Sequence, residues 1–229
     1  MPGVGSRRRE IELEHVRRRI EEGDPYWPAQ LSIGVAIVLN VLLSDQLTIG
    51  PRFLLPGVEL VLLFVLVVVV PRRATRHDRR RRMFALTVVG LVSATTIFSL
   101  ARLAHFLIGG GQVGGRRLVE SGGVLWLTIV LLFAVFYWEF DAGGPVARMD
   151  RPDYPDFLFT PMGSPEHAPP NWRAGFVDYL YLSLTNSVAF SPTDTLPLTG
   201  SAKVVMGVQS VTALLTLALV IARAVNILG

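Results

Sequence analysis

The sequence contains no cysteine in its 229 residues and only four histidines. The absence of cysteine excludes disulfide bonds, a thiol nucleophile and a metal site with cysteine ligands. The sequence also has no glycine-rich phosphate loop, no His/Glu set with metal-ligand spacing and no Ser/His/Asp arrangement. The four histidines are scattered along the chain, at His15, His77, His105 and His167. We therefore expect no enzymatic activity, no bound metal and no cofactor.

Charged residues are scarce as well, at 17% of the chain, whereas 51% of the residues are hydrophobic. A membrane-spanning helix needs about 20 mostly apolar residues, and several apolar blocks reach that length alone or with their flanks. These blocks lie near 31–43, 53–70, 83–108, 124–138, 176–190 and 202–228. A soluble protein with buried helices would not separate its charges so cleanly. The predicted fold is an all-α polytopic membrane bundle, with five full crossings and one short or re-entrant pore-like helix.

The arginines predict the orientation of this bundle. They cluster at Arg7–Arg9, Arg17–Arg19 and Arg72–Arg82, and the net charge is +4. The positive-inside rule places such clusters in the cytoplasm, where they also attract anionic lipids of the bilayer. Short clusters that flank membrane segments do not indicate a nucleic-acid partner. The charged stretch after the first residues is not a cleavable signal peptide.

Four regions follow from composition. Residues 1–25 form a cytoplasmic amphipathic helix, and residues 26–141 form a membrane region of four helices. Residues 142–175 form a loop rich in proline and aromatic residues, which excludes a long helix there. In this loop Asp153 and Asp156 could bind a cation, but solvated carboxylates are the favoured interpretation. Residues 176–229 form a pore-loop-like helix, a loop and a final transmembrane helix.

Glu59 is a carboxylate inside the second apolar block. An ionisable residue in a membrane segment is a candidate functional residue by default. Glu59 also lies in the first helical turn after Pro56, where the helix dipole favours a negative charge. The helix-dipole explanation is favoured over an ion or proton site.

The segment from residue 176 to 199 carries the clearest functional signal. Ser183, Thr185, Asn186 and Ser187 place hydroxyl groups and an amide on a short helix, which breaks into a loop ending at Asp194. Oxygen-lined loops can replace the hydration shell of an ion, and carboxylates favour cations. The alternative is a connecting turn in which Ser191 or Asp194 caps a helix. The pore or filter candidates are Ser187, Val188, Ala189, Phe190, Ser191, Thr193 and Asp194.

Polar residues also recur on the last apolar helix. Gln209, Thr212, Thr216 and Arg223 fall at intervals of three, four and seven, near Ala213. Polar side chains of membrane helices usually face the bundle or a cavity. The pattern therefore predicts either helix packing or the lining of a pore.

The run from Asp178 to Arg223 resembles the pore module of tetrameric potassium-type channels. The pore helix is matched by Tyr179, Tyr181, Ser183, Leu184 and Thr185, and the filter exit by Asp194 with Pro197-Leu198-Thr199. Between them stand Ser187 to Asp194, without the glycines of the channel filter. The resemblance implies a homotetramer that conducts inorganic cations.

The whole chain resembles a group of bacterial multi-pass membrane proteins without an established activity. The similarity is carried by Gly50–Pro56 with Glu59, Tyr137–Pro145, Pro155–Phe159, Phe190–Asp194 and Ala222–Ile227. It implies a location in the bacterial inner membrane.

Two arrangements of 176–190 remain open. A full crossing gives six segments with both termini inside, and this arrangement is preferred; a re-entrant segment would enter from the cytoplasm and leave the C-terminus outside. Three functions are considered: a cation pore, a carrier with a midplane site around Asn186 and Gln209, and a structural membrane partner that docks through residues 142–173.

Overall fold

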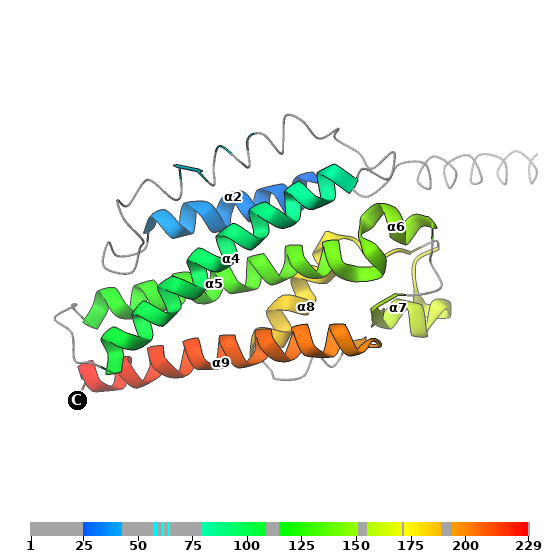
Figure 1. Ribbon diagram of the computed structural model, residues 1–229. Helices are drawn as coiled ribbons and strands as arrows, with labels where there is room; N and C mark the ends of the chain where they lie inside the picture. Colours follow the sequence, from blue (N-terminus) through cyan, green and yellow to red (C-terminus); the bar gives the residue numbers. More distant parts are fainter. Residues whose placement is uncertain are drawn as a thin grey trace, which may run out of the picture.

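The computed structural model describes residues 25–42, 57–58, 61, 64, 79–108, 115–150, 155–170, 172–188 and 194–228. Five longer helices dominate this part of the chain (Figure 1). They are α2 (Trp27–Leu42), α4 (Arg79–Ile108), α5 (Gly115–Phe140), α8 (Phe176–Val188) and α9 (Gly200–Leu228). The predicted amphipathic helix of residues 1–25 lies outside the described residues, apart from Pro25.

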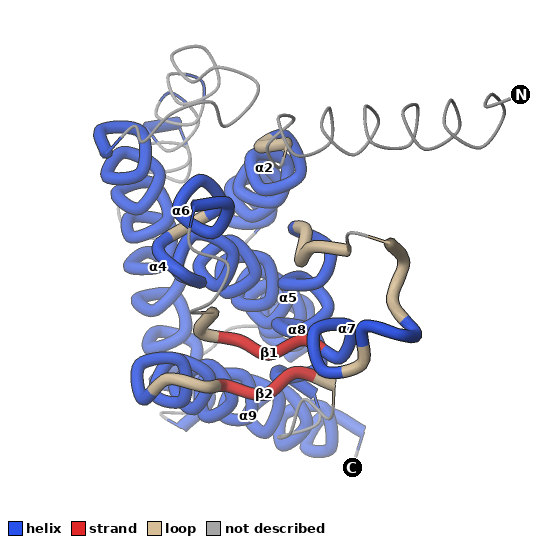
Figure 2. Tube along the Cα trace, turned by 90° about the vertical axis from the view of Figure 1, so that its right-hand side faces the viewer, coloured by secondary structure: helices blue, strands red, loops and turns tan. Residues whose placement is uncertain are grey.

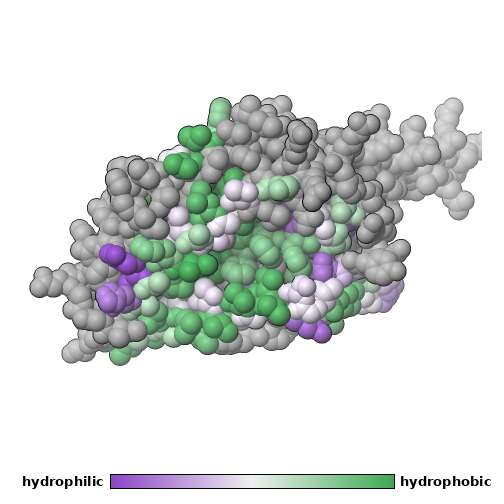
Figure 3. Space-filling view, in the orientation of Figure 1, coloured by the Kyte–Doolittle hydropathy of each residue, from purple (hydrophilic) through white to green (hydrophobic). Residues whose placement is uncertain are grey.

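Three of the helices are long and apolar enough to cross a membrane. The candidate spans are Thr87–His105, Val119–Gly143 and Gly200–Ala222, and α2 is a shorter apolar helix. Among the residues coloured in Figure 3, hydrophobic side chains cover most of the middle of this face, and hydrophilic side chains gather towards its two ends. The prediction of a helical membrane protein is confirmed at this level, and the number of crossings stays a prediction.

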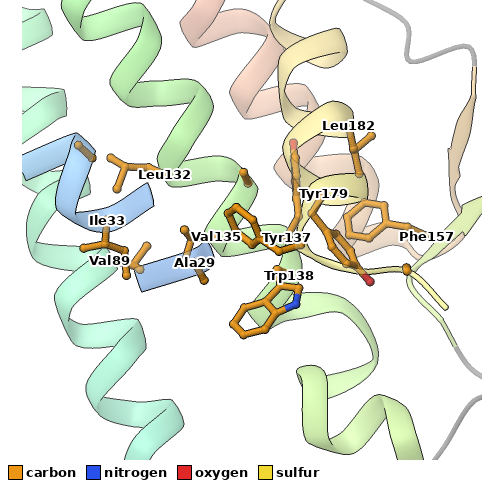
Figure 4. Packing of buried hydrophobic residues seen from close by; sticks show 14 of the residues in the cluster. Ala29, Ile33, Val89, Leu132, Val135, Tyr137, Trp138, Phe157, Tyr179 and Leu182 are labelled. Carbon is orange, nitrogen blue, oxygen red and sulfur yellow. The ribbon is translucent and has the colours of Figure 1, made fainter. Parts of the chain in front are cut away.

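The central helix is α5, which lies against α2, α4, α8 and α9. Its inner side chains, including Leu132, Val135 and Trp138, belong to the main hydrophobic core, together with Ile33 of α2 and Val89 of α4 (Figure 4). A helix that is apolar on all sides is stable only where neighbouring helices bury it, and the central position of α5 provides this burial.

The bundle has two ends, which are named here after one residue each. At the Asp141 end, Tyr26 before α2 packs edge-on against Trp138 near the end of α5, with 5.6 Å between ring centroids. At the Gly122 end, Val220 of α9 lies directly against Gly122 of α5. The start of α2 and the end of α9 therefore lie at opposite ends of the bundle (Figure 1).

Helix α8 reaches only part of the way along the bundle. Its 13 residues span about 20 Å at 1.5 Å per residue, whereas the hydrocarbon core is about 30 Å thick. It begins at the Asp141 end, where Phe176 packs on Trp138. Its Ser183 hydroxyl donates to the Val130 carbonyl, midway along the span of α5.

The chain after α8 returns to the end from which α8 started. Thr195–Pro197 (β2) pairs antiparallel with Phe157–Phe159 (β1), and the ribbon of two strands lies across the Asp141 end (Figure 2). Helix α8 and β2 therefore meet at one end of the bundle, whereas the side of the membrane on which each terminus lies stays a prediction. Of the two arrangements, the re-entrant one agrees better with this strand pairing, which returns residues 195–197 to the end at which α8 starts.

The loop predicted at 142–175 contains short pieces of structure instead of a long helix. They are η2 (Asp141–Gly143), α6 (Pro145–Asp150), β1, α7 (Thr160–Gly163) and η3 (Pro165–His167). The two strands correct the all-α prediction in a small way. They form because Phe157, Phe159 and Thr195 are buried on the inner face of the ribbon.

Candidate functional site

Buried polar side chains gather in two clusters among the described residues. The first, called the mid-depth cluster, consists of Tyr137, Ser183, Asn186, Ser187, Gln209 and Ser210. The second, called the Asp141 cluster, consists of Asp141, Arg148, Asp156, Tyr179 and Thr199. The mid-depth cluster joins α8 to α5 and α9, and the Asp141 cluster organises the end at which α8 starts.

Gln209 of α9 is the hub of the mid-depth cluster and is completely buried. Its amide nitrogen Nε2 donates to the Ser183 carbonyl at 2.9 Å, the Ser183 hydroxyl at 2.7 Å and the Ser187 hydroxyl at 2.8 Å. Its oxygen Oε1 accepts from the hydroxyl of Tyr137 and from Asn186 Nδ2. One side chain therefore links α9 to both neighbouring helices.

Asn186 completes the cluster from α8. Its Nδ2 donates to Gln209 Oε1 at 2.8 Å, to the Met206 carbonyl at 3.0 Å and to the Tyr137 hydroxyl at 3.2 Å. Its Oδ1 accepts from the Ser210 hydroxyl at 3.0 Å. Both amides therefore have partners on the nitrogen and on the oxygen, as buried polar groups require.

Asp141 is fully buried at the end of α5 and is the acceptor around which the second cluster forms. Its Oδ1 accepts from the backbone nitrogens of Asp156 at 2.7 Å and Phe157 at 3.3 Å, and its Oδ2 accepts from the Tyr179 hydroxyl. Arg148 Nη1 lies 3.7 Å from Asp141 Oδ2. One carboxylate thus fixes the entrance to β1 and the first turns of α8.

Arg148 also closes the C-terminus of α5. Its Nη1 donates to the carbonyls of Trp138 at 2.9 Å and Asp141 at 3.2 Å, and its guanidinium lies 4.9 Å from the ring centroid of Tyr179. A cation is favourable at this position because the last carbonyls of a helix lack helical partners and carry the negative end of its dipole.

A sharp turn after α5 brings Arg148 back over the end of the helix. Ala142, Gly143 and Gly144 all have positive φ, at 51°, 85° and 105°. Glycine adopts these values without a steric penalty, whereas Ala142 needs support. Its backbone nitrogen donates to Asp156 Oδ2 at 2.9 Å, which holds it in place.

Asp156 further connects this turn to α9. Its Oδ1 accepts from the Thr199 hydroxyl at 2.6 Å, and the Thr199 hydroxyl accepts from the Ala202 backbone nitrogen at 3.2 Å, as an N-cap residue does. Asp156 is therefore engaged within the fold, unlike the solvated carboxylate favoured from the sequence.

The structure brings four of the predicted site residues together: Ser183, Asn186, Ser187 and Gln209. Thr185, Thr212 and Thr216 are placed differently, because their hydroxyls donate to carbonyls one turn earlier in their own helices. Val188 is exposed at the end of α8. The side chain of Arg223 is not among those described.

Asp194 directly precedes β2 and lies at the Asp141 end. Its Oδ2 accepts from the Tyr181 hydroxyl at 3.1 Å, and its carbonyl accepts from the Thr160 hydroxyl at 2.7 Å. The filter candidates Ala189, Phe190, Ser191 and Thr193 lie outside the described residues, as does Glu59.

Tyr137 and most of the Asp141 cluster were not among the site residues predicted from the sequence. A tyrosine beside Trp138 at the end of an apolar helix is typical of an interfacial anchor. The signal for Asp141 was available: an acidic residue directly after an apolar helix, followed by two glycines and a proline, with an arginine at position 148.

Comparisons with protein-family models, curated proteins and solved structures find no match to this chain.

Proposed function

We propose that this chain is a pore-forming membrane protein for cations, in which the segment that begins with α8 and ends at β2 enters and leaves the bundle at the Asp141 end, as a re-entrant segment. The observation that carries the proposal is the course of α8. It starts at the Asp141 end, its Ser183 lies beside Val130 midway along α5, and the chain is back at the same end by β2. Non-helical backbone at membrane depth needs a protein wall or a water-filled cavity beside it.

The direction of α8 supports a cation as the permeant species. The C-terminus of α8 is at mid-depth, and the C-terminal end of a helix carries partial negative charge on its last carbonyl groups. Half-helices of this kind stabilise cations in transport proteins. Asp194 adds a carboxylate at the mouth of the segment.

The arginine clusters orient the proposed pore. Arg72–Arg82 leads into α4, and α4 begins at the Asp141 end. We count five crossings, made by α2, the second apolar block, α4, α5 and α9. Because the positive-inside rule places the arginine cluster in the cytoplasm, the Asp141 end faces the cytoplasm. The re-entrant segment then enters from the cytoplasm, opposite to potassium-type channels.

The carrier hypothesis is less well supported by the mid-depth cluster. A carrier needs polar groups that a solute can engage, whereas the amides of Asn186 and Gln209 are bonded to each other and to neighbouring helices. The cluster is instead well suited to hold α8 rigid, as a filter helix requires.

Cation flux into proteoliposomes tests the proposal. Purified wild type is compared with Asp194→Asn and with Glu166→Gln, an exposed carboxylate of η3 that lies 3.3 Å from His167 Nδ1. We expect potassium or thallium influx in the wild type, a several-fold lower rate in Asp194→Asn and no change in Glu166→Gln. No flux from folded, inserted wild type would refute the pore and favour the structural-partner hypothesis.

A further inference from the structure

The β1–β2 ribbon has an inner and an outer face. On the inner face Phe157, Phe159 and Thr195 are buried, whereas Leu196 on the outer face is 57% exposed. The ribbon lies across the Asp141 end of the bundle (Figure 2). It therefore covers this end of the bundle as a lid does, with its inner face towards the helices.

Phe157 is the side chain that separates the ribbon from the mid-depth cluster. Its ring is completely buried and packs edge-on against two tyrosines, with 5.2 Å between centroids to Tyr137 and 6.5 Å to Tyr179 (Figure 4). The hydroxyl of Tyr137 bonds to Gln209, the hub of the mid-depth cluster. One aromatic layer therefore stands between the ribbon and the cluster.

The mid-depth cluster depends on the exclusion of water. A hydrogen bond between side chains is stronger in a medium of low dielectric constant, and water competes with it for donors and acceptors. The amides of Asn186 and Gln209 are the groups that join α8 to α5 and α9. Water that entered beneath the ribbon would weaken these bonds, so the position of α8 depends on the ribbon.

Carboxylates attach the ribbon to the bundle where β1 begins. Asp156 accepts from the Thr199 hydroxyl at 2.6 Å and from the Ala142 backbone nitrogen at 2.9 Å. Asp141 accepts from the backbone nitrogens of Asp156 and Phe157. A few polar contacts of two side chains therefore hold this end of the ribbon in place.

This attachment holds a strained residue. Ala142 has φ 51° and ψ 24°, in the left-handed region that residues other than glycine rarely adopt, and Asp156 binds its backbone nitrogen. Release of Asp156 would relieve the strain. At the other end of the ribbon, the bond from the Thr160 hydroxyl to the Asp194 carbonyl is exposed to solvent. Short strands with exposed hydrogen bonds open at a lower free-energy cost than the core.

We infer that the β1–β2 ribbon is a lid that opens without unfolding of the bundle, with Asp156 as its latch. The closed lid keeps the mid-depth cluster dry and α8 fixed. The open lid admits water to the cluster and releases α8. The inference rests on the proposed function only for the consequence of opening, because a released α8 no longer supports the ion pathway.

The reaction rates of buried single cysteines test the inference, since the chain has no native cysteine. Ser183→Cys reports on the mid-depth cluster, and Thr96→Cys reports on α4, away from the ribbon; both native side chains are buried. Each full-length variant in lipid nanodiscs is treated with a small, charged methanethiosulfonate, which reaches both ends of the bundle. The test variant is Asp156→Ala, and the matched control is Glu166→Ala, an exposed carboxylate of η3.

Asp156→Ala should make Ser183→Cys react about tenfold faster or more, because the loss of a hydrogen bond to a charged group shifts the opening equilibrium by this factor. Thr96→Cys should keep its rate, and Glu166→Ala should change neither rate. Thr160→Val loosens the other end of the ribbon and gives a second test, with a several-fold acceleration, if Asp156→Ala fails to fold. Equal acceleration at both cysteines, or none at Ser183→Cys, would overturn the lid.

The flux assay distinguishes failure of the lid from failure of the pore. Acceleration confined to Ser183→Cys, with no cation flux from folded wild type, would refute the pore and leave the lid. Cation flux from wild type, with the same Ser183→Cys rate whether or not Asp156 is replaced, would overturn the lid and leave the pore.

Discussion

Replacement of Gln209 by leucine should weaken the fold, because Gln209 joins three helices. The wild-type side chain has five partner atoms, on Tyr137, Asn186, Ser187 and Ser183. Its amide nitrogen has two hydrogens, so about four full hydrogen bonds form at once. Interhelical hydrogen bonds in membranes contribute on average about 0.6 kcal/mol each, which sums to about 2.4 kcal/mol. Because Ser183 and Asn186 keep other partners, Val130 and Met206, we expect a loss of about 2–3 kcal/mol.

The loss can be measured by reversible unfolding in mixed micelles, with tryptophan fluorescence as the signal. The matched control is Thr212→Val, one turn further along α9, whose hydroxyl donates only to the Val208 carbonyl of its own helix at 2.7 Å. This control should remain within about 0.5 kcal/mol of wild type. If Gln209→Leu were equally neutral, Gln209 would face water or lipid, and the closed cluster would be refuted.

A double-mutant cycle sharpens the test. Asn186→Ala and Gln209→Leu remove two ends of the same hydrogen bond, so their effects should not add. Residues in one network show coupling energies of about 0.5–3 kcal/mol. A coupling energy near zero would mean that the two amides act independently.

Asp141→Asn should lower the free energy of unfolding by about 2–4 kcal/mol, because it removes the charge that faces Arg148 in a buried pair. The control Glu166→Gln, at an exposed position, should stay within about 0.5 kcal/mol of wild type. Gly122→Ala should cost about 1–3 kcal/mol, because its new Cβ would lie 2.1 Å from Val220 Cγ2. Gly123→Ala has open space and should stabilise α5 by about 0.5–1 kcal/mol; thermal unfolding compares the two. Single cysteines at Glu166 and His105 should react with an impermeant maleimide from opposite sides of sealed vesicles, and reaction from the same side would contradict the arrangement of α4 and α5.

The membrane helices were predictable because their signal is local. The apolar blocks at 83–108 and 124–138 reveal α4 and the greater part of α5 by their own composition, although α4 begins at Arg79 and α5 already at Gly115. The prolines between residues 145 and 170 likewise exclude a long helix by their own geometry. Each of these features depends on residues that are neighbours in the sequence.

The course of α8 was not predictable in the same way. Whether the segment crosses or re-enters depends on the end to which residues 195–197 return, and that is decided by pairing with residues 157–159. Three-residue strands have no pattern strong enough to reveal such a partner. Hydropathy and arginine counts constrain crossings, but they contain no information about this contact.

The candidate site was half predictable for a related reason. Asn186 and Gln209 stand out because amides are rare in apolar helices. Their common partner Tyr137 does not stand out, since tyrosine is ordinary near the end of a membrane helix. The sequence could therefore identify the polar groups but not whether they bind one another or a solute.

The mutual bonding of these groups bears on what the protein does. A solute that bound to Asn186 or Gln209 would have to break hydrogen bonds that hold α8 against α5 and α9. The mid-depth cluster is therefore better regarded as the support of α8 than as a binding site. A rigid half-helix is useful where its end must keep a fixed position at mid-depth, as beside a narrow pathway for ions. The residues that decide selectivity should then be sought between Val188 and Asp194, next to the support and not within it.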